Sequence, residues 1–358
     1  MTDLDEVLER FAHCELEYAG GLANHGPMVA EALVELGHAA LLVGWVDLYA
    51  PRLRPLASDR PLDEALREAR LGRADLLARW VATFEGEIAQ AGWRECLARR
   101  LPELLPGLFA GAAHGLLRVA HAVRALDRAD TAVRRAELAR GLAYWAGRYQ
   151  RLPGEPGTSS RPGSGCTPGK ALARVVPLPL AQRKPGLFFD AVRALDGDRE
   201  FVRAIESVDL SIGFESALAE LCRAGVELYL ENPAARIAYV HVLTAPSALR
   251  LLAPHLDEAA RLRALGYAFQ AAAALHAVSA TPARSSASVG GPEDWELRTL
   301  ARDPDAIRYR AACSLQEHAI KFAEACLREH AVAPDEIWLR AAADAALHLE
   351  NDRHQRAC

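Results

Sequence analysis

Apolar residues recur at helical spacing in almost every segment of this 358-residue chain. The clearest case is LQEHAIKFAEACL, residues 315–327, where the apolar positions follow the i, i+4, i+7, i+11 pattern of one buried helix stripe. That stripe consists of Leu315, Ala319, Phe322 and Cys326. In contrast, no alternating apolar and polar run is long enough for a sheet. Since 51% of the residues are hydrophobic and can bury a large core, we predict an all-α fold in a single multi-helix domain, residues 1–358.

Two segments between the predicted helices are rich in Pro, Gly and Ser. The longer is RLPGEPGTSSRPGSGCTPGK, residues 151–170, and the shorter is TPARSSASVGGPED, residues 281–294. Neither segment has the apolar periodicity that packing against a core requires. We therefore expect a flexible loop at about 153–169 within the single domain.

Charge and cysteine content exclude several classes of protein. The formal net charge is −5, and basic residues alternate with acidic ones, so the chain lacks the basic footprint of a nucleic-acid-binding protein. Its seven Cys are odd in number and contain no CxxC pair, which argues against a disulfide framework and against a thiolate zinc site. The acidic N-terminus does not resemble a signal peptide, and the uninterrupted apolar run at 39–46 is too short to span a membrane. We expect a cytoplasmic protein that binds neither nucleic acid nor a membrane.

The predicted helix at 315–327 also carries His318 and Lys321. Because they are three residues apart, their side chains lie only about 60° apart around the helix axis and project into one space. Lys is rare here: the 42 basic residues include only Lys170, Lys184 and Lys321. A desolvated amine, unlike a guanidinium, can lose its proton and then add CO2 or attack a carbonyl. The alternative is structural, with Lys321 reaching solvent and His318 hydrogen-bonded in the core.

Two further histidines occupy notable positions in predicted helices. His25 directly precedes Gly26-Pro27, a typical helix start, and the positive end of the helix dipole would keep its ring neutral and able to bind a metal or accept a proton. His241 falls inside the helix that we expect to begin at Asn232-Pro233. Either histidine could instead be structural, as a turn residue or a core residue.

His114 lies in a segment crowded with Gly and Ala, which we predict to be one helix over 105–126. Small residues there would let a neighbouring backbone or a ligand approach closely. His121 is seven residues further on and shares the same face, while His276 lies in the helical segment 246–278. Tight helix packing around structural histidines is the alternative explanation for this segment.

Several common catalytic motifs are missing from the sequence. Without GxGxxG after a strand there is no Rossmann site for NAD(P)H or flavin, and GxxxxGK[ST], HExxH and GxSxG are absent as well. A ferritin-like di-iron site would need two ExxH pairs, but the chain has one, Glu35 to His38, interrupted by Gly37. What remains is a set of histidines, each within or at the end of an apolar helix.

Four motifs in order resemble the questin oxidase-like family, whose fungal members open anthraquinone rings and which includes bacterial relatives. They are NHGPMVAEALVELG, HGLLRVAHAVRAL, YVHVLTAPSALRLL and EHAIKFAEACL, and they span residues 24 to 327. The resemblance implies an all-helical fold with a buried pocket for a metal and a substrate. It further implies a mononuclear non-haem Fe(2+) held by four histidines and a carboxylated lysine. Carried onto this chain, the metal ligands are His25, His114, His241, His318 and Lys321, and we assign His318 and Lys321 to the catalytic group as well.

Three hypotheses for function follow. The first is an iron-dependent mono- or dioxygenase, Baeyer–Villiger-like or C–C cleaving, that uses O2 to oxidise or cleave a small apolar aromatic of the polyketide, anthraquinone-like type. The second is a metal-dependent hydrolase, and the third is a non-catalytic helical binding protein for apolar ligands. The substrate and the oligomeric state stay open, as does the replacement of His114 or His241 by His121 or His276 as a ligand.

Overall fold

The structure is a computed structural model that describes residues 3–158, 166–280 and 292–349. Within these residues it contains seventeen α-helices and one two-stranded antiparallel hairpin, and the buried apolar side chains form a common core. The prediction of a single all-α domain is confirmed. The α-helices are α1 (Leu4–Phe11), α2 (Gly26–Glu35), α3 (Leu42–Tyr49), α4 (Leu77–Ala91), α5 (Trp93–Leu104), α6 (His114–Arg128), α7 (Ala132–Gly147), α8 (Pro168–Leu172), α9 (Phe188–Ala191), α10 (Arg199–Glu206), α11 (Phe214–Glu231), α12 (Arg236–Leu252), α13 (Glu258–Ser279), α14 (Pro292–Leu300), α15 (Pro304–Cys313), α16 (Glu317–Val332) and α17 (Glu336–His348). The strands are β1 (Glu17–Tyr18) and β2 (Leu22–Ala23).

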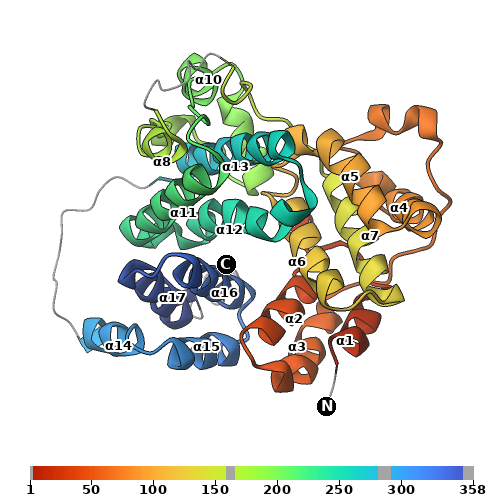
Figure 1. The fold of residues 1–358 in the computed structure, drawn as a ribbon, viewed down its shortest axis with the longest axis horizontal. Helices are drawn as coiled ribbons and strands as arrows, with labels where there is room; N and C mark the ends of the chain where they lie inside the picture. Colours follow the sequence, from red (N-terminus) through yellow and green to blue (C-terminus); the bar gives the residue numbers. More distant parts are fainter. Residues whose placement is uncertain (1–2, 159–165, 281–291, 350–358) are drawn as a thin grey trace.

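Four helices form a ring at the centre of the molecule. Helix α2 packs against α6 and α16, and α12 packs against the same two helices from the other side (Figure 1). The predicted ligands are carried by these four elements: His25 is the N-cap of α2, His114 is the first residue of α6, His241 lies within α12, and His318 is the second residue of α16.

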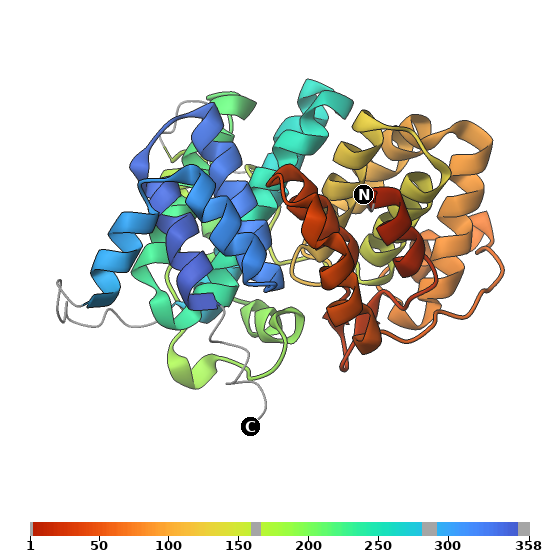
Figure 2. The ribbon, with the colours of Figure 1, turned by 90° about the horizontal axis from the view of Figure 1, so that it is seen from below.

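The remaining helices cover the outside of this ring. Helix α7 packs against α6 and α4, α11 and α13 pack against α12, and α17 packs against α16. Figure 2 shows the N-terminal helices, red to yellow, on one side of the molecule and the C-terminal helices, green to blue, on the other. The four ring helices therefore lie where the two halves of the chain meet, and the candidate site is built from both.

One part of the ring has the length and composition of a membrane span. The segment Pro233–His255, which includes α12, passes that test, but 78% of its apolar window is buried inside the protein. Burial of this extent is expected for the core helix of a globular domain. The apolar character of α12 is thus accounted for by its contacts with α6, α11, α13 and α16.

The prediction of one helix over 105–126 is wrong in its first half. Helix α6 begins only at His114, because Gly111, Ala112 and Ala113 have φ angles of 56°, 58° and 66° and form a left-handed turn that a right-handed helix cannot contain. The expected close approach is present further on. A Cβ atom on Gly115 would lie 2.8 Å from the Cα of Trp145. Glycine at this position therefore lets the backbone of α6 lie directly against Trp145 of α7.

The predicted helix at 315–327 likewise starts later, at Glu317. Leu315 has a φ of 48° and ends the preceding segment, so it does not belong to the helix stripe. Gln316 caps the new helix, since its side-chain oxygen accepts hydrogen bonds from the backbone N–H groups of His318 and Ala319 at 2.7 and 2.9 Å. Phe322 and the other helical members of the stripe are fully buried.

The described ends of the Pro/Gly/Ser-rich segment are attached to the body of the protein. The amide of Gln270 donates hydrogen bonds to the carbonyls of Leu152, Pro153 and Gly154, and Thr167 bonds to Glu220. The centre of the segment, 159–165, lies outside the described residues, as does most of 281–294. A flexible loop at about 153–169 therefore stays a prediction.

Candidate metal centre

The structure brings the four predicted histidines together. Their ring centroids form a closed cycle, with 4.6 Å from His25 to His114, 4.6 Å from His114 to His241, 5.4 Å from His241 to His318 and 4.8 Å from His318 to His25. The possible ligand atoms of His25, His114 and His318 lie within 4.8 Å of one another. All four side chains are buried. Four imidazoles from four separate helices thus meet in one place, as a mononuclear metal site requires.

The left-handed turn before α6 fixes the tautomer of His114. Its Nδ1 lies 2.6 Å from the carbonyl oxygen of Gly111. A carbonyl can only accept, so Nδ1 carries the proton and Nε2 presents a lone pair. This Nε2 is buried and has no hydrogen-bond partner among the residues that the structure describes, and neither has Nδ1 of His25. Orienting a histidine through its second nitrogen is the usual arrangement in metal sites.

Lys321 lies beside the histidines and is only 2% exposed. Within the described part of the chain, its Nζ has no hydrogen-bond partner. Burial lowers the pKa of this amine to about 7, against the opposing effect of the Glu317 carboxylate. About half of the amine is therefore neutral near pH 7, whereas an ordinary lysine is almost entirely protonated there.

His25 and His114 are held in the neutral form that can bind a metal. Burial, followed by repulsion from Lys321 and the neighbouring imidazoles, brings the pKa of His25 well below its ordinary value. Burial also lowers the pKa of His114 to about 3, although its bond to Gly111 acts in the opposite direction. Helices α2, α6 and α16 all begin at the site, and the positive ends of their dipoles disfavour imidazolium further.

A cavity of about 560 Å³ opens beside the four rings. Its other walls are mostly apolar, and Phe188 contacts the His241 ring edge-on with centroids 6.1 Å apart. The remaining lining residues are Tyr18, Ala19, Gly20, Gly21, Leu22, Ala23, Gly111, Ala112, Gly186, Leu187, Phe189, Ile237 and Glu317. Apolar walls with a few polar groups are typical of sites for small organic molecules.

Backbone strain is concentrated around this cavity. In the described part of the chain, four residues other than glycine have positive φ angles. They are Ala19, Ala112, Ala113 and Leu315. Ala19 and Ala112 line the cavity, Ala113 directly precedes His114, and Leu315 lies three residues before His318. Each such conformation costs roughly 1–3 kcal/mol, and strain of this kind clusters at functional sites.

The two alternative histidines lie elsewhere. His121 Nδ1 is 2.7 Å from a carboxylate oxygen of Glu31, and His276 Nδ1 is 2.8 Å from the Tyr239 hydroxyl. Neither belongs to the cycle of four rings. The geometry therefore favours the ligand set given by the four motifs over either replacement.

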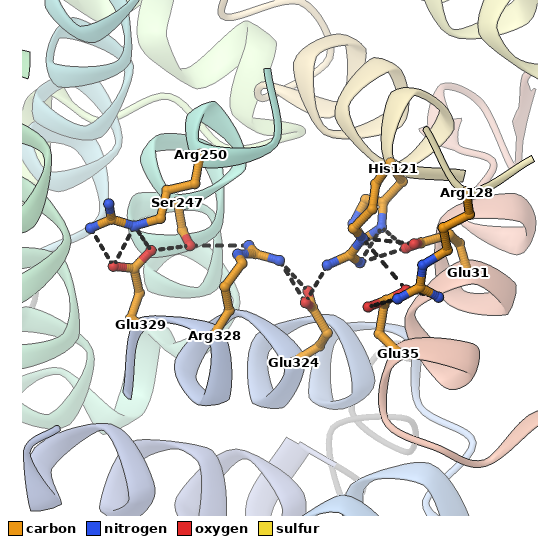
Figure 3. Close-up of polar contacts among 10 residues, drawn as sticks. Glu31, Glu35, His121, Arg128, Ser247, Arg250, Glu324, Arg328 and Glu329 are labelled. Carbon is orange, nitrogen blue, oxygen red and sulfur yellow. Dashed lines mark hydrogen bonds and ion pairs between the residues drawn. The ribbon is translucent and has the colours of Figure 1, made fainter. Parts of the chain in front are cut away.

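A second layer of the ring was not predicted from the sequence. About two helical turns beyond the histidines, buried charged and polar side chains connect the same four helices (Figure 3). Arg250 and Ser247 donate to Glu329, Arg328 donates to Ser247 and Glu324, and Arg124 donates to Glu324 and Glu31. On every ring helix the histidine precedes the residues of this layer along the chain.

Pairing across the ring also explains why this layer escaped prediction. The partners Arg124 and Glu31 are 93 residues apart, and Arg124 and Glu324 are 200 apart. Charged residues within otherwise apolar helix faces, such as Glu31 and Glu324, are the signal that could have indicated buried ion pairs.

The sequence matches the family model described as Questin oxidase-like over residues 23–326, which contains all four histidines and Lys321. No curated protein matches the chain. Membership of such a family implies an oxidoreductase that acts with O2 on a small molecule. Since the match covers most of the sequence and the helical fold agrees with it, the chain belongs to the questin oxidase-like family.

Proposed function

We propose that this protein is a non-haem iron-dependent oxygenase that oxidises or cleaves the ring of an aromatic, polyketide-type substrate similar to an anthraquinone. The observation that carries this proposal is the cycle of four buried imidazoles next to a buried lysine, at the edge of an apolar cavity. Family membership supports oxidation of an aromatic polyketide.

The residues present fit a divalent iron. Buried polar atoms nearly always have a partner, so Nδ1 of His25 and Nε2 of His114, which have none among the described residues, support ligand binding by these two nitrogens. Imidazole nitrogens together with one anionic oxygen suit Fe(2+). The four histidines and a carboxylated Lys321 would hold the metal, and bound iron would supply the ability to activate dioxygen.

Carboxylation of Lys321 follows from the state of its amine. The neutral nitrogen forms a bond to the carbon of CO2, one C=O electron pair moves to oxygen, and the nitrogen releases a proton to give the N–COO⁻ group. The reaction needs a neutral amine, which the pKa of about 7 provides near neutral pH. The positive ends of α2, α6 and α16 would stabilise the resulting anion.

The chain's other residues bind the substrate and exclude water. Phe188 and Phe189 offer aromatic faces and edges to a planar ring, and Leu187 and Ile237 extend the apolar wall. An apolar wall removes competing water from the reacting groups and strengthens every polar contact within the cavity. A planar, mostly apolar aromatic is therefore the substrate that these walls favour.

The two alternative functions, a hydrolase and a binding protein, would use the same residues differently. A metal-dependent hydrolase would use the same ligands, but the family match favours an oxidoreductase. A non-catalytic binding protein would use the cavity alone and would leave the histidine nitrogens and the lysine amine buried without a function, at a cost in stability.

Metal content and oxygen uptake test the proposal. We expect about one iron per chain in protein purified without a histidine tag. Single alanine variants of His25, His114, His241 and His318 should lose the iron. His276→Ala is the matched control, because its buried ring lies outside the cycle and its iron content should stay at the wild-type level. Wild-type protein that binds no metal would support the binding-protein alternative, and metal without oxygen uptake on aromatic substrates would favour the hydrolase.

A further inference from the structure

A second cavity, of about 470 Å³, lies outside the candidate metal centre. Its walls come mainly from α4, α5 and the segments 64–71 and 149–151, and it shares no lining residue with the cavity beside the four histidines. Trp80 and Phe84 of α4 stack in its wall, with ring centroids 5.6 Å apart and an interplanar angle of 18°, and Leu104 of α5 is buried beside the same cavity. Aromatic and aliphatic walls around a space of this size are typical of sites for small organic molecules.

The indole N–H of Trp80 is a donor without an acceptor in this wall. Trp80 is 3% exposed, and its Nε1 has no hydrogen-bond partner among the residues that the structure describes. Three other buried tryptophans, Trp45, Trp93 and Trp145, each donate the same group to an oxygen atom, at 3.1, 3.2 and 3.1 Å. A buried donor that stays unpaired destabilises the folded protein, so such groups are rare. An acceptor atom that enters the second cavity would remove this cost.

Arg67 provides a second donor in the same wall. Its Nη1 pairs with Glu87, but its Nε is buried and also has no partner in the described part of the chain. Arginine can only donate, so this group too requires an acceptor. Two unpaired donors around one cavity indicate a ligand that carries an oxygen or nitrogen lone pair.

The charges around the second cavity favour an uncharged ligand. The guanidinium of Arg100 pairs with Glu87 and with Glu103, so the positive charges at the inner end of the cavity already have their counter-ions. Two exposed carboxylates, Glu64 and Glu68, lie at its rim and would repel an anion, while the inner guanidinium groups would repel a cation. A carbonyl oxygen supplies an acceptor without a net charge.

We propose that the second cavity binds an uncharged, planar organic molecule whose carbonyl oxygen accepts the indole N–H of Trp80 and whose ring packs against Phe84 and Leu104. The ligand class is that of aromatic ketones and amides. This site is separate from the four histidines, so its occupation depends neither on iron nor on the proposed oxygenase function.

Indole NMR signals of protein labelled with 15N-tryptophan test binding at the residue concerned. The chain has six tryptophans, and the Trp80 signal is the one that disappears in Trp80→Phe. The probes are 1-indanone and indane, which have the same fused rings and differ by one carbonyl oxygen. We expect 1-indanone to move the Trp80 N–H signal downfield relative to indane, in a saturable manner. Because it gains one hydrogen bond, it should bind this site about three- to tenfold more tightly than indane.

Two variants that fill one cavity each locate the ligand. Leu71→Phe adds volume to the wall of the second cavity and should abolish the response of the Trp80 signal. Ile237→Phe is the matched control, because it makes the same kind of change in the cavity beside the histidines and should leave that response intact. The remaining indole signals show whether each variant is folded.

Three results would overturn the proposal. A Trp80 signal that 1-indanone does not move would mean that the cavity takes no such ligand, and an unchanged response in folded Leu71→Phe would place the ligand elsewhere. Equal affinities for 1-indanone and indane would show that the carbonyl oxygen does not accept from Trp80.

Discussion

Arg124 is the residue whose loss should damage the central ring most. It lies on α6 and donates two hydrogen bonds to Glu31 of α2, at 2.7 and 2.5 Å, and one to Glu324 of α16 at 2.5 Å. The substitution Arg124→Met keeps much of the side-chain length and removes the charge. Two buried carboxylates would then lose the cation that they share.

The magnitude follows from the state of these carboxylates. Burial alone would raise the pKa of Glu31 and Glu324, but Arg124 leads the neighbouring charges that bring each pKa from 4.5 to about 2. A shift of this size corresponds to roughly 3 kcal/mol for each group. Since Arg328 and His121 keep part of the effect, we expect Arg124→Met to lower the free energy of unfolding by about 3–5 kcal/mol at pH 7.

The pH dependence of the stability difference between wild type and Arg124→Met provides a second, independent test. A carboxyl whose pKa is depressed in the folded protein stabilises it above the unfolded pKa, and this contribution is lost as the pH falls through the folded pKa. For Glu31 and Glu324 that window runs from about 4.5 down to about 2. In Arg124→Met the buried carboxyls should take up protons at higher pH, so the difference from wild type should shrink between pH 7 and pH 4.

Urea unfolding at pH 7 and at pH 4 measures both effects, and Arg128→Met is the matched control. Arg128 lies one turn further along α6 and pairs with Glu35, but its side chain is 50% exposed, so its loss should cost about 0–1 kcal/mol. If Arg124→Met costs no more than Arg128→Met, or if its effect grows as the pH falls, the paired charges of the buried layer do not stabilise the ring.

Two further predictions concern the lysine and the loop. Lys321→Arg should abolish oxygen uptake and lower iron content even with added bicarbonate, because a guanidinium cannot take up CO2; an active Arg variant would rule out the carbamate. Limited proteolysis should cut first within about 153–169, since that segment lacks the apolar periodicity needed for packing, whereas first cleavage inside α6 would contradict this layout.

Local sequence signals were sufficient to predict where the helices of the site begin and which of them are buried. Gly26-Pro27 marks the start of α2, and the structure places His25 directly at that N-cap. Apolar periodicity also identified α12 and α16 as buried helices. The convergence of the histidines required the family's ordered motifs, because no local pattern states that four helices far apart in the chain share one ring.

The errors occur where tertiary contacts override local preference. Residues 105–113 are apolar and were predicted to belong to the helix of His114, although Pro106, Gly107 and Gly111 disfavour a helix there; the chain instead turns left-handed at Gly111 and aims a carbonyl at His114. Leu315 fits the apolar period but lies before the helix, because the side chain of Gln316 caps the helix start. Both departures sit next to a predicted ligand, so the local rules fail where the site imposes its own geometry.

The site and the buried layer have opposite effects on stability. At the site, four residues with positive φ, a lysine kept half neutral and one ring nitrogen each of His25 and His114 without a partner among the described residues all oppose folding. Two turns deeper, Arg124 and its partners tie α2, α6 and α16 together through charges that are fully paired. Because His25, His114 and His318 lie at the N-terminal ends of these three helices, the layer restrains the separation of the helices and hence the spacing of the three histidines. The arrangement keeps the ligands close together before any metal or CO2 binds, which reduces the entropy that binding must overcome.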